Sequence, residues 1–199
     1  MAIEIIDEGQ DNVILLDPYH KENGSGQIRC IGNNNKVVIR NPLVFNKLFV
    51  EAGNGANIVV GEHAAVNELW LNSPRGASIK IGRGLQVNGS VAIRADEEAN
   101  ITMGDNCLLA PGVKIWSSDM HSIFEQSTGK RINHARDIII EDHVWLCDEV
   151  KVLKGSIIRS NSVIGSNSVV AREIPANSVA VGNPVQVKKT GINWSIDLI

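Results

Sequence analysis

Residues 140–174 read IEDHVWLCDEVKVLKGSIIRSNSVIGSNSVVAREI, and this stretch decides the fold. One aliphatic side chain returns at every sixth position without a slip. The six positions are Ile140, Leu146, Val152, Ile158, Ile164 and Val170. An amphipathic helix would repeat its apolar residues about every 3.6 positions, and a half-buried strand would repeat them at every second position. A period of six instead predicts one flat side of a prism per repeat, as in the hexapeptide repeats of parallel β-helices.

The other positions of each repeat agree with a prism whose sides meet at tight corners. Four residues after each aliphatic comes a small or β-branched side chain that can turn inward at a narrow corner. These residues are Val144, Val150, Ser156, Ser162, Ser168 and Ile174. Polar residues, Gly and Asn fill the positions between, as solvated turns require. Three repeats should close one turn, so the pattern predicts an all-β fold, a single-stranded parallel β-helix.

Two flanking features make this stretch similar to a known family. Trp145 stands at its head, and Gly182-Asn183-Pro184 follows its end. With these features the segment resembles the hexapeptide-repeat acetyltransferases, and within them the O-acetyltransferases of sugars and capsular polysaccharides, including those that contain sialic acid. The resemblance implies a left-handed winding, which general physics does not predict because crossover connections are usually right-handed. It also implies a homotrimer with active sites at the subunit boundaries.

Length, charge and composition fit one acidic domain. At 199 residues the chain suits a single domain. A net charge of −3 and a pI near 5.9 argue against a nucleic-acid-binding protein, which would normally present a basic surface. Aromatic residues make up only 4% of the chain, as expected if a thin prism is filled by stacked aliphatic side chains.

The sequence also favours a cytoplasmic protein without a membrane span. Residues 1–8 contain acids where a signal peptide needs a basic and then a long apolar stretch. No segment offers about 18 uninterrupted apolar residues. Cys30, Cys107 and Cys147 are odd in number and far apart, which favours reduced thiols over disulfides or a zinc cluster.

Spacing along the chain divides this domain into parts. Residues 1–27 contain short apolar groups broken by turn residues, and we expect them to form an N-terminal cap over the end of the stack. The β-helix should span 28–181, and 182–199 should form a C-terminal tail. Val60, Ile81, Met103 and Ile140 mark one side of the prism in successive turns. The first two intervals, 21 and 22 residues, exceed the 18 of three clean repeats, so we expect short insertions at the corners.

The third interval, from Met103 to Ile140, is 37 residues long and predicts an extruded loop at about 119–134. Unstructured excursions of this length in a compact domain are usually functional. The loop opens on Ser117-Ser118-Asp119-Met120-His121, immediately after an apolar strand-like segment. In the resembling family the catalytic base stands at the head of such a loop, in a Ser-x-x-x-His or Asp-x-His setting. Histidine is partly neutral at physiological pH and can accept the proton of an attacking hydroxyl. We therefore assign His121 as general base, with Asp119, Glu125 or a backbone carbonyl as the group that orients its ring.

The other histidines are better explained without catalysis or metal binding. His20 lies in the cap, His63 and His143 lie at outward turns, and His134 lies at the far end of the loop, so we expect all four to be solvated. The carbonic anhydrases that share this fold need zinc-binding histidines five residues apart. That spacing does not occur here, so we expect no metal.

The resemblance assigns further residues to the donor site. Trp145 would wall the acetyl pocket beside the catalytic histidine of a neighbouring subunit. Cys147 stands where the family usually has Gly, and its backbone N–H is one candidate contact for the thioester. Acetyl-CoA would lie between coils of two subunits. Its pantetheine would lie near Cys147, Ser166 and Ala171, and its phosphates and adenine near Arg172, Pro184, Lys188 and Lys189.

These expectations describe a direct acetyl transfer from acetyl-CoA to a sugar hydroxyl, with the loop cations Lys130 and Arg131 contacting an anionic glycan. One alternative is an acetyltransferase acting on a nucleotide-linked amino sugar or on a small acceptor such as serine. A second is a non-catalytic β-helix that serves as a scaffold; such a protein would have no use for His121, the long loop and Trp145 together.

Overall fold

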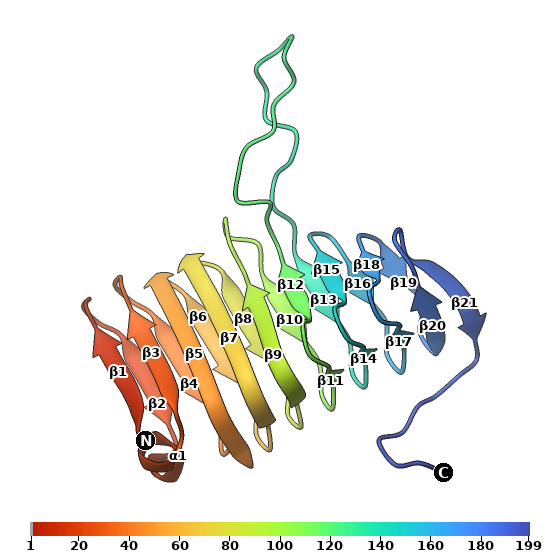
Figure 1. Cartoon of the computed structure of the whole chain (residues 1–199). Coiled ribbons are helices and arrows are strands. Elements are labelled where there is room, and N and C mark those ends of the chain that lie inside the picture. The colour runs from red at the N-terminus through yellow and green to blue at the C-terminus, as the bar shows by residue number, and fades with distance from the viewer. Residues whose placement is uncertain (1) are drawn as a thin grey trace.

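Parallel strands wind into a prism, and the computed structural model describes residues 2–199 of it (Figure 1). Met1, the first residue of the expected cap, lies outside the described residues. An eight-stranded sheet forms one side of the prism. Along the axis it contains β2 (Val13–Leu16), β4 (Lys36–Ile39), β6 (Asn57–Val60), β8 (Ser78–Ile81), β10 (Ile101–Met103), β13 (Ile138–Ile140), β16 (Ile157–Ile158) and β19 (Glu173–Ile174). The prediction of an all-β parallel β-helix is confirmed.

A thirteen-stranded sheet wraps the rest of the prism. Its main path contains β1 (Ile3–Asp7), β3 (Gly26–Cys30), β5 (Val44–Asn54), β7 (Ala65–Arg75), β9 (Gln86–Arg94), β11 (Leu108–Leu109), β14 (Trp145–Leu146), β17 (Val163–Ile164), β20 (Ser178–Val181) and β21 (Gln186–Thr190). The strands β12 (Lys114–Trp116), β15 (Lys151–Leu153) and β18 (Val169–Val170) branch from it. The start of β9 pairs with β11 and its end pairs with β12, so the sheet divides there into two faces.

The sixfold repeat places its aliphatic residues in the core, as predicted. None of the six residues of the repeat is more than 1% exposed, and the same holds for the six corner residues. The marker positions of the earlier coils are also in register, because Val60 pairs with Ile81, Ile81 with Met103, and Met103 with Ile140. Side chains of one kind therefore stack directly above each other along a narrow dry core.

The first 27 residues do more than cover the end of the stack. β1 pairs in parallel with β3, and β2 pairs in parallel with β4, so parallel pairing already begins at Ile3. The short helix α1 (Pro18–Asn23) links β2 to β3 at the end of the prism (Figure 1). The expected corner insertions are present at the corner that leads back into the eight-stranded sheet. Seven residues separate Arg94 from Thr102, whereas three separate the matching residues Leu153 and Ile157 of a later coil. β5 and β7 are 11 residues long each and extend into this corner.

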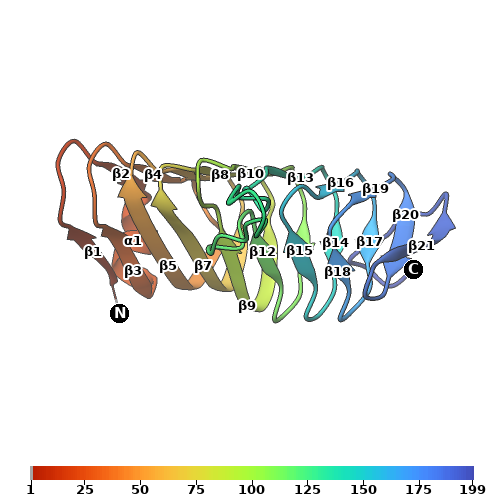
Figure 2. The ribbon, with the colours of Figure 1, turned by 90° about the horizontal axis from the view of Figure 1, so that it is seen from above.

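The long loop leaves the prism after β12 and returns at β13, as predicted. Figure 1 shows it standing away from the stack, and in Figure 2, seen from above, it overlies the prism near β10 and β12. Its two arms pair as in a hairpin, because the N–H of Ile132 donates to the carbonyl of Ile123 (2.8 Å) and that of Glu125 donates to the carbonyl of Lys130 (2.9 Å). Ile123, Phe124 and Ile132 are more than half exposed on these arms.

The C-terminal tail reverses direction against the last coil. β21 pairs antiparallel with β20, and the residues beyond it run back along the prism without forming a helix (Figure 1). The N–H of Ile192 donates to the carbonyl of Asn177 (3.0 Å), and the side-chain amide of Asn177 donates back to the carbonyl of Ile192 (3.1 Å). This tie holds the tail against its own chain.

Candidate active site

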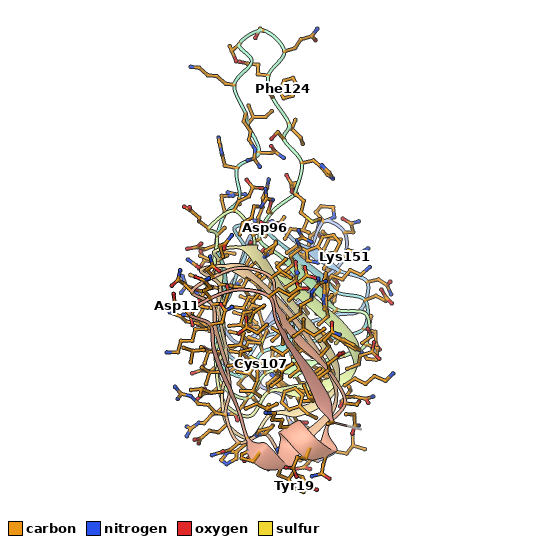
Figure 3. All side chains as sticks on the ribbon, turned by 90° about the vertical axis from the view of Figure 1, so that its left-hand side faces the viewer. Asp11, Tyr19, Asp96, Cys107, Phe124 and Lys151 are labelled. Atoms are coloured by element: carbon orange, nitrogen blue, oxygen red, sulfur yellow. The ribbon has the colours of Figure 1, made fainter. Side chains whose placement is uncertain are left out.

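His121 lies on the outbound arm of the loop, five residues beyond the end of β12. Its side chain is exposed, as are those of all residues from 121 to 130. Figure 3 shows the loop from the end of the prism, with Phe124 high on it and Asp96 at its base. The imidazole is thus presented to a ligand or a partner between the rigid prism and the hairpin-like tip.

One carboxylate, that of Glu97, fastens both arms of the loop to the coil beneath. The guanidinium of Arg131, on the return arm, donates to it through Nη1 and Nη2, the latter at 3.0 Å. The hydroxyl of Ser118, on the outbound arm, donates to the same carboxylate. The bonds from Arg131 and Ser118 favour the charged form and lower the pKa of Glu97 to about 2. The base of the loop is therefore tied on both sides.

A second tie comes from the following coil. The ammonium of Lys154, at the end of β15, donates to the carboxylate of Asp119 and to the carbonyl of Asn133 (2.9 Å). Lys154 and the amide of Asn133 lower the pKa of Asp119. Sequence reasoning missed this role of Lys154, because its partner Asp119 is 35 residues away in the chain.

The groups expected to orient the imidazole have other partners. Asp119 is held by Lys154 and Asn133, and the carboxylate of Glu125 accepts from the hydroxyl of Thr128 (2.7 Å). Within residues 2–199 no hydrogen bond joins either carboxylate to the ring of His121. The backbone around His121 is held instead, as its carbonyl accepts from the side-chain amide of Asn133 (2.8 Å).

The two loop cations differ in their surroundings. Lys130 is exposed at the tip. The side chain of Arg131 is only 26% exposed and is paired with Glu97, so a glycan contact through Arg131 would have to compete with that ion pair.

Trp145 lies half-buried on β14, where its backbone pairs with Leu108 and Val163. Its indole is 5.8 Å from that of Trp194 in the tail, measured between ring centroids. Trp194 also stacks on His143, so the expectation that His143 is solvated is wrong. Sequence reasoning missed this cluster. The only signal for it was a tryptophan in the tail of a chain that is poor in aromatic residues.

One chain does not bring Trp145 and His121 together. In Figure 1 the loop rises above β12 and β13, whereas β14 lies on the lower part of the prism. A site that uses both residues therefore needs the loop of one subunit and β14 of another.

The backbone N–H of Cys147 is already used within the β-helix. It donates to the carbonyl of Ile164 (2.9 Å), as the N–H of Gly165 donates to the carbonyl of Ala180 (2.9 Å) at the same corner one coil later. The proposed contact of this N–H with a thioester is therefore not available. Burial raises the pKa of the Cys147 thiol to about 11, and Ser166 lies exposed one coil further on.

The residues expected near the phosphates gather at the C-terminal end. Ala171 and Arg172 are exposed just after β18, and Pro184 is exposed at a cis peptide bond before β21. A hollow of about 260 Å³ lies between Arg172 and the β21 residues Gln186 and Val187. Lys188 and Lys189 are exposed on the same strand. The structure thus places Arg172 near the strand that carries the two lysines.

The remaining histidines have no shared site. His20 contacts the carboxylate of Asp17 at 3.0 Å and its side chain is only 13% exposed, so the expectation that His20 is solvated is wrong. His63 and His134 are exposed, as expected. Residues 2–199 contain no cluster of three or more His, Cys, Asp or Glu side chains placed to hold a metal ion. In the same range, no helix has the length and apolar character needed to cross a membrane.

Comparisons with known proteins agree with the observed fold. No family model matches the chain. The polysialic acid O-acetyltransferase of Neisseria meningitidis is 33% identical over 151 residues, which are 75% of this chain and 69% of that protein. The crystal structure of the polysialic acid O-acetyltransferase OatWY superposes with a TM-score of 0.83 at 30% identity, over 98% of this chain and 92% of that one. The chain belongs to the hexapeptide-repeat acetyltransferases, in the family that includes the polysialic acid O-acetyltransferases.

A further relative shares only part of its length with this chain. The polysialic acid O-acetyltransferase of Escherichia coli O1:K1 is 34% identical over 99 residues, which are 50% of this chain and 32% of that protein. The matched structures are left-handed β-helices, in agreement with the winding that the resemblance implied.

Proposed function

We propose that this protein transfers an acetyl group from acetyl-CoA to a hydroxyl of a surface or capsular polysaccharide that contains sialic acid. The observation that carries the proposal is His121, an exposed imidazole on a long loop whose base is fastened by Glu97 and Lys154. Sequence similarity to polysialic acid O-acetyltransferases supports the choice of acceptor. A cytoplasmic location remains a prediction.

His121 would act as general base on the acceptor hydroxyl. As the sugar oxygen attacks the thioester carbon, its proton passes to the imidazole, the C–S bond breaks, and the proton is then delivered to the departing thiolate of coenzyme A. The raised pKa of Cys147 supports a direct transfer, because a protonated thiol is a poor nucleophile for a covalent intermediate. Trp145 would line the pocket for the acetyl group with its indole.

Acetyl-CoA would lie along the groove between two subunits, as the family resemblance implies. Exposed Arg172, Lys188 and Lys189 provide positive charge for its phosphates, and Ser166, Ala171 and Pro184 provide uncharged surface. On the acceptor side, exposed Lys130 supplies charge for an anionic glycan. These cations stand out because the chain as a whole is acidic.

A homotrimer would complete the site. The separation of the loop from β14 within one chain supports an active site shared between subunits. The apolar side chains of Ile123, Phe124 and Ile132, which the loop leaves more than half exposed, would find cover on a neighbouring subunit. Sedimentation analysis should give three times the mass of the 21.5 kDa chain.

Replacement of His121 by Ala tests the proposal. Transfer from acetyl-CoA to sialic acid polymers should fall by a factor of at least about 10² to 10⁴, the usual contribution of a general base. Trimer mass and coenzyme A binding should stay unchanged. Retention of more than a few percent of the activity by a trimeric variant would overturn the assignment.

A further inference from the structure

Asn133, on the return arm of the loop, makes four side-chain hydrogen bonds close to His121. It is 9% exposed, although the ten residues from 121 to 130 are all exposed. A polar side chain is buried at this depth only when its hydrogen bonds are satisfied.

The amide of Asn133 uses all of its bonding capacity. Its Nδ2 donates to the carboxylate of Asp119 (2.8 Å) and to the carbonyl of His121 (2.8 Å). Its Oδ1 accepts from the N–H of Ile123 (2.7 Å) and from Nε of Arg131 (3.2 Å). Two donors and two acceptor positions are the complete inventory of an amide, so every one is occupied.

The partners also decide which way the amide points. A carboxylate and a carbonyl on one side can only accept, and an N–H and a guanidinium on the other side can only donate. Asp at this position would have no donor and would place a second carboxylate against Asp119. Gln would be one methylene too long, and Ala would leave the four partners unsatisfied.

We propose that Asn133 is the positioning residue of His121. This inference rests on the proposed role of His121 as general base. Asn133 holds the backbone at the histidine and just beyond it, through the carbonyl of His121 and the N–H of Ile123. It also holds the carboxylate of Asp119, two residues before the histidine, and so joins this outbound segment to the return arm. We call Asn133 and its four side-chain partners, Asp119, His121, Ile123 and Arg131, the clasp. The backbone carbonyl of Asn133 accepts from Lys154, which links the clasp to the rigid coil. The clasp fixes where the imidazole emerges, and Asn133 itself does not touch the reacting atoms.

The test uses the assembled 199-residue protein that carries N133D, with T128A as the matched control. Thr128 bonds Glu125 at the tip of the loop and takes no part in the clasp. N133D should lower kcat about tenfold or more, because small misplacements of a catalytic group are costly, and should leave KM for acetyl-CoA within about twofold. T128A should keep the wild-type values. Coenzyme A binding by calorimetry should be the same in all three proteins, because the loop is outside the expected donor groove.

A double variant separates positioning from other roles. In the H121A background, N133D should cause no further loss, because the clasp acts only through the imidazole. A further loss in that background would overturn the inference, as would N133D with wild-type kcat or with lost coenzyme A binding. An active H121A would contradict the proposed role of His121 as general base. An inactive H121A together with a fully active N133D would contradict only the role of Asn133.

Discussion

The indole of Trp194 lies flat against the imidazole of His143, with ring centroids 4.2 Å apart and ring planes 10° apart. The indole N–H donates to the carbonyl of His143 at 2.8 Å, so the tail contacts both the ring and the backbone of one corner residue. Nδ1 of that imidazole is 3.0 Å from the side-chain oxygen of Asn161 in the next coil. The tail thereby brings a second tryptophan against Trp145, which we place in the acetyl pocket.

Replacement of Trp194 by Ala should impair the enzyme more than it destabilises the prism. Trp145 would lose an aromatic neighbour, and such contacts are worth about 0.5–1.5 kcal/mol. We expect kcat/KM for acetyl-CoA to fall by roughly two- to tenfold. Steady-state kinetics and thermal unfolding measure the two effects.

Trp194→Phe is the matched control for this change. The phenylalanine keeps a ring on His143 but lacks the N–H that donates to the carbonyl of His143. Its kcat/KM for acetyl-CoA should therefore lie between that of the wild type and that of Trp194→Ala. The circular dichroism spectrum of both variants should lack the signal that arises from coupling between the indoles of Trp145 and Trp194. Wild-type kinetics in Trp194→Ala would show that the tail does not support Trp145.

The attachment of the loop should weaken in acid. The pKa of Glu97 is lowered to about 2, whereas an unfolded Glu has a pKa near 4.3. The stabilisation from this carboxylate is therefore complete above about pH 4.3 and is lost as the pH falls towards about 2. Hydrogen exchange of the loop base, corrected for the intrinsic effect of pH, should speed up across this window. In Glu97→Gln the amides at the base of the loop should exchange fast already at neutral pH. Equal protection of these amides in the wild type and in Glu97→Gln would contradict the role of Glu97.

Cys147 should be unreactive in the folded protein. With a pKa of about 11 its thiolate fraction at pH 7 is about 1 in 10⁴, against about 3 in 100 for an ordinary thiol. Burial also raises the pKa of Cys107, to about 12, and that of Cys30. A small alkylating reagent should therefore react slowly with the native protein and readily with all three thiols after unfolding in denaturant. Rapid native alkylation mapped to Cys147 would disagree with this burial.

The repeat residues should carry the stability of the prism. Ile158→Ala removes a fully buried side chain and should lower the free energy of unfolding by about 2–5 kcal/mol. Its neighbour Ile157 is half-buried on the outer surface of the same strand and provides the matched control. Ile157→Ala should lower the free energy of unfolding by clearly less than Ile158→Ala. Denaturant unfolding of both variants gives the comparison. Equal losses would mean that the sixfold pattern does not mark the core.

Much of the fold could be predicted because the β-helix repeats at short range. Each residue of the sixfold pattern is buried by neighbours in the adjacent coils, so one period in the sequence encodes both the local turn and the stacking. The same logic located the loop, because a break in a regular interval is visible without any structure. The N-terminal coils were harder, because the 11-residue strands β5 and β7 follow no period of six.

The sequence by itself determined the prism, its core positions and the place where His121 leaves it. Only the tertiary structure decided what holds that histidine and what covers Trp145. Lys154 and Asp119 are 35 residues apart, and Trp194 and His143 are 51 apart. Such pairs have no characteristic spacing in the sequence, because contacts between polar or aromatic side chains at corners and in loops depend on which segments the fold brings together. A repeating core, in contrast, must show its pattern in the chain, since every coil buries the same positions.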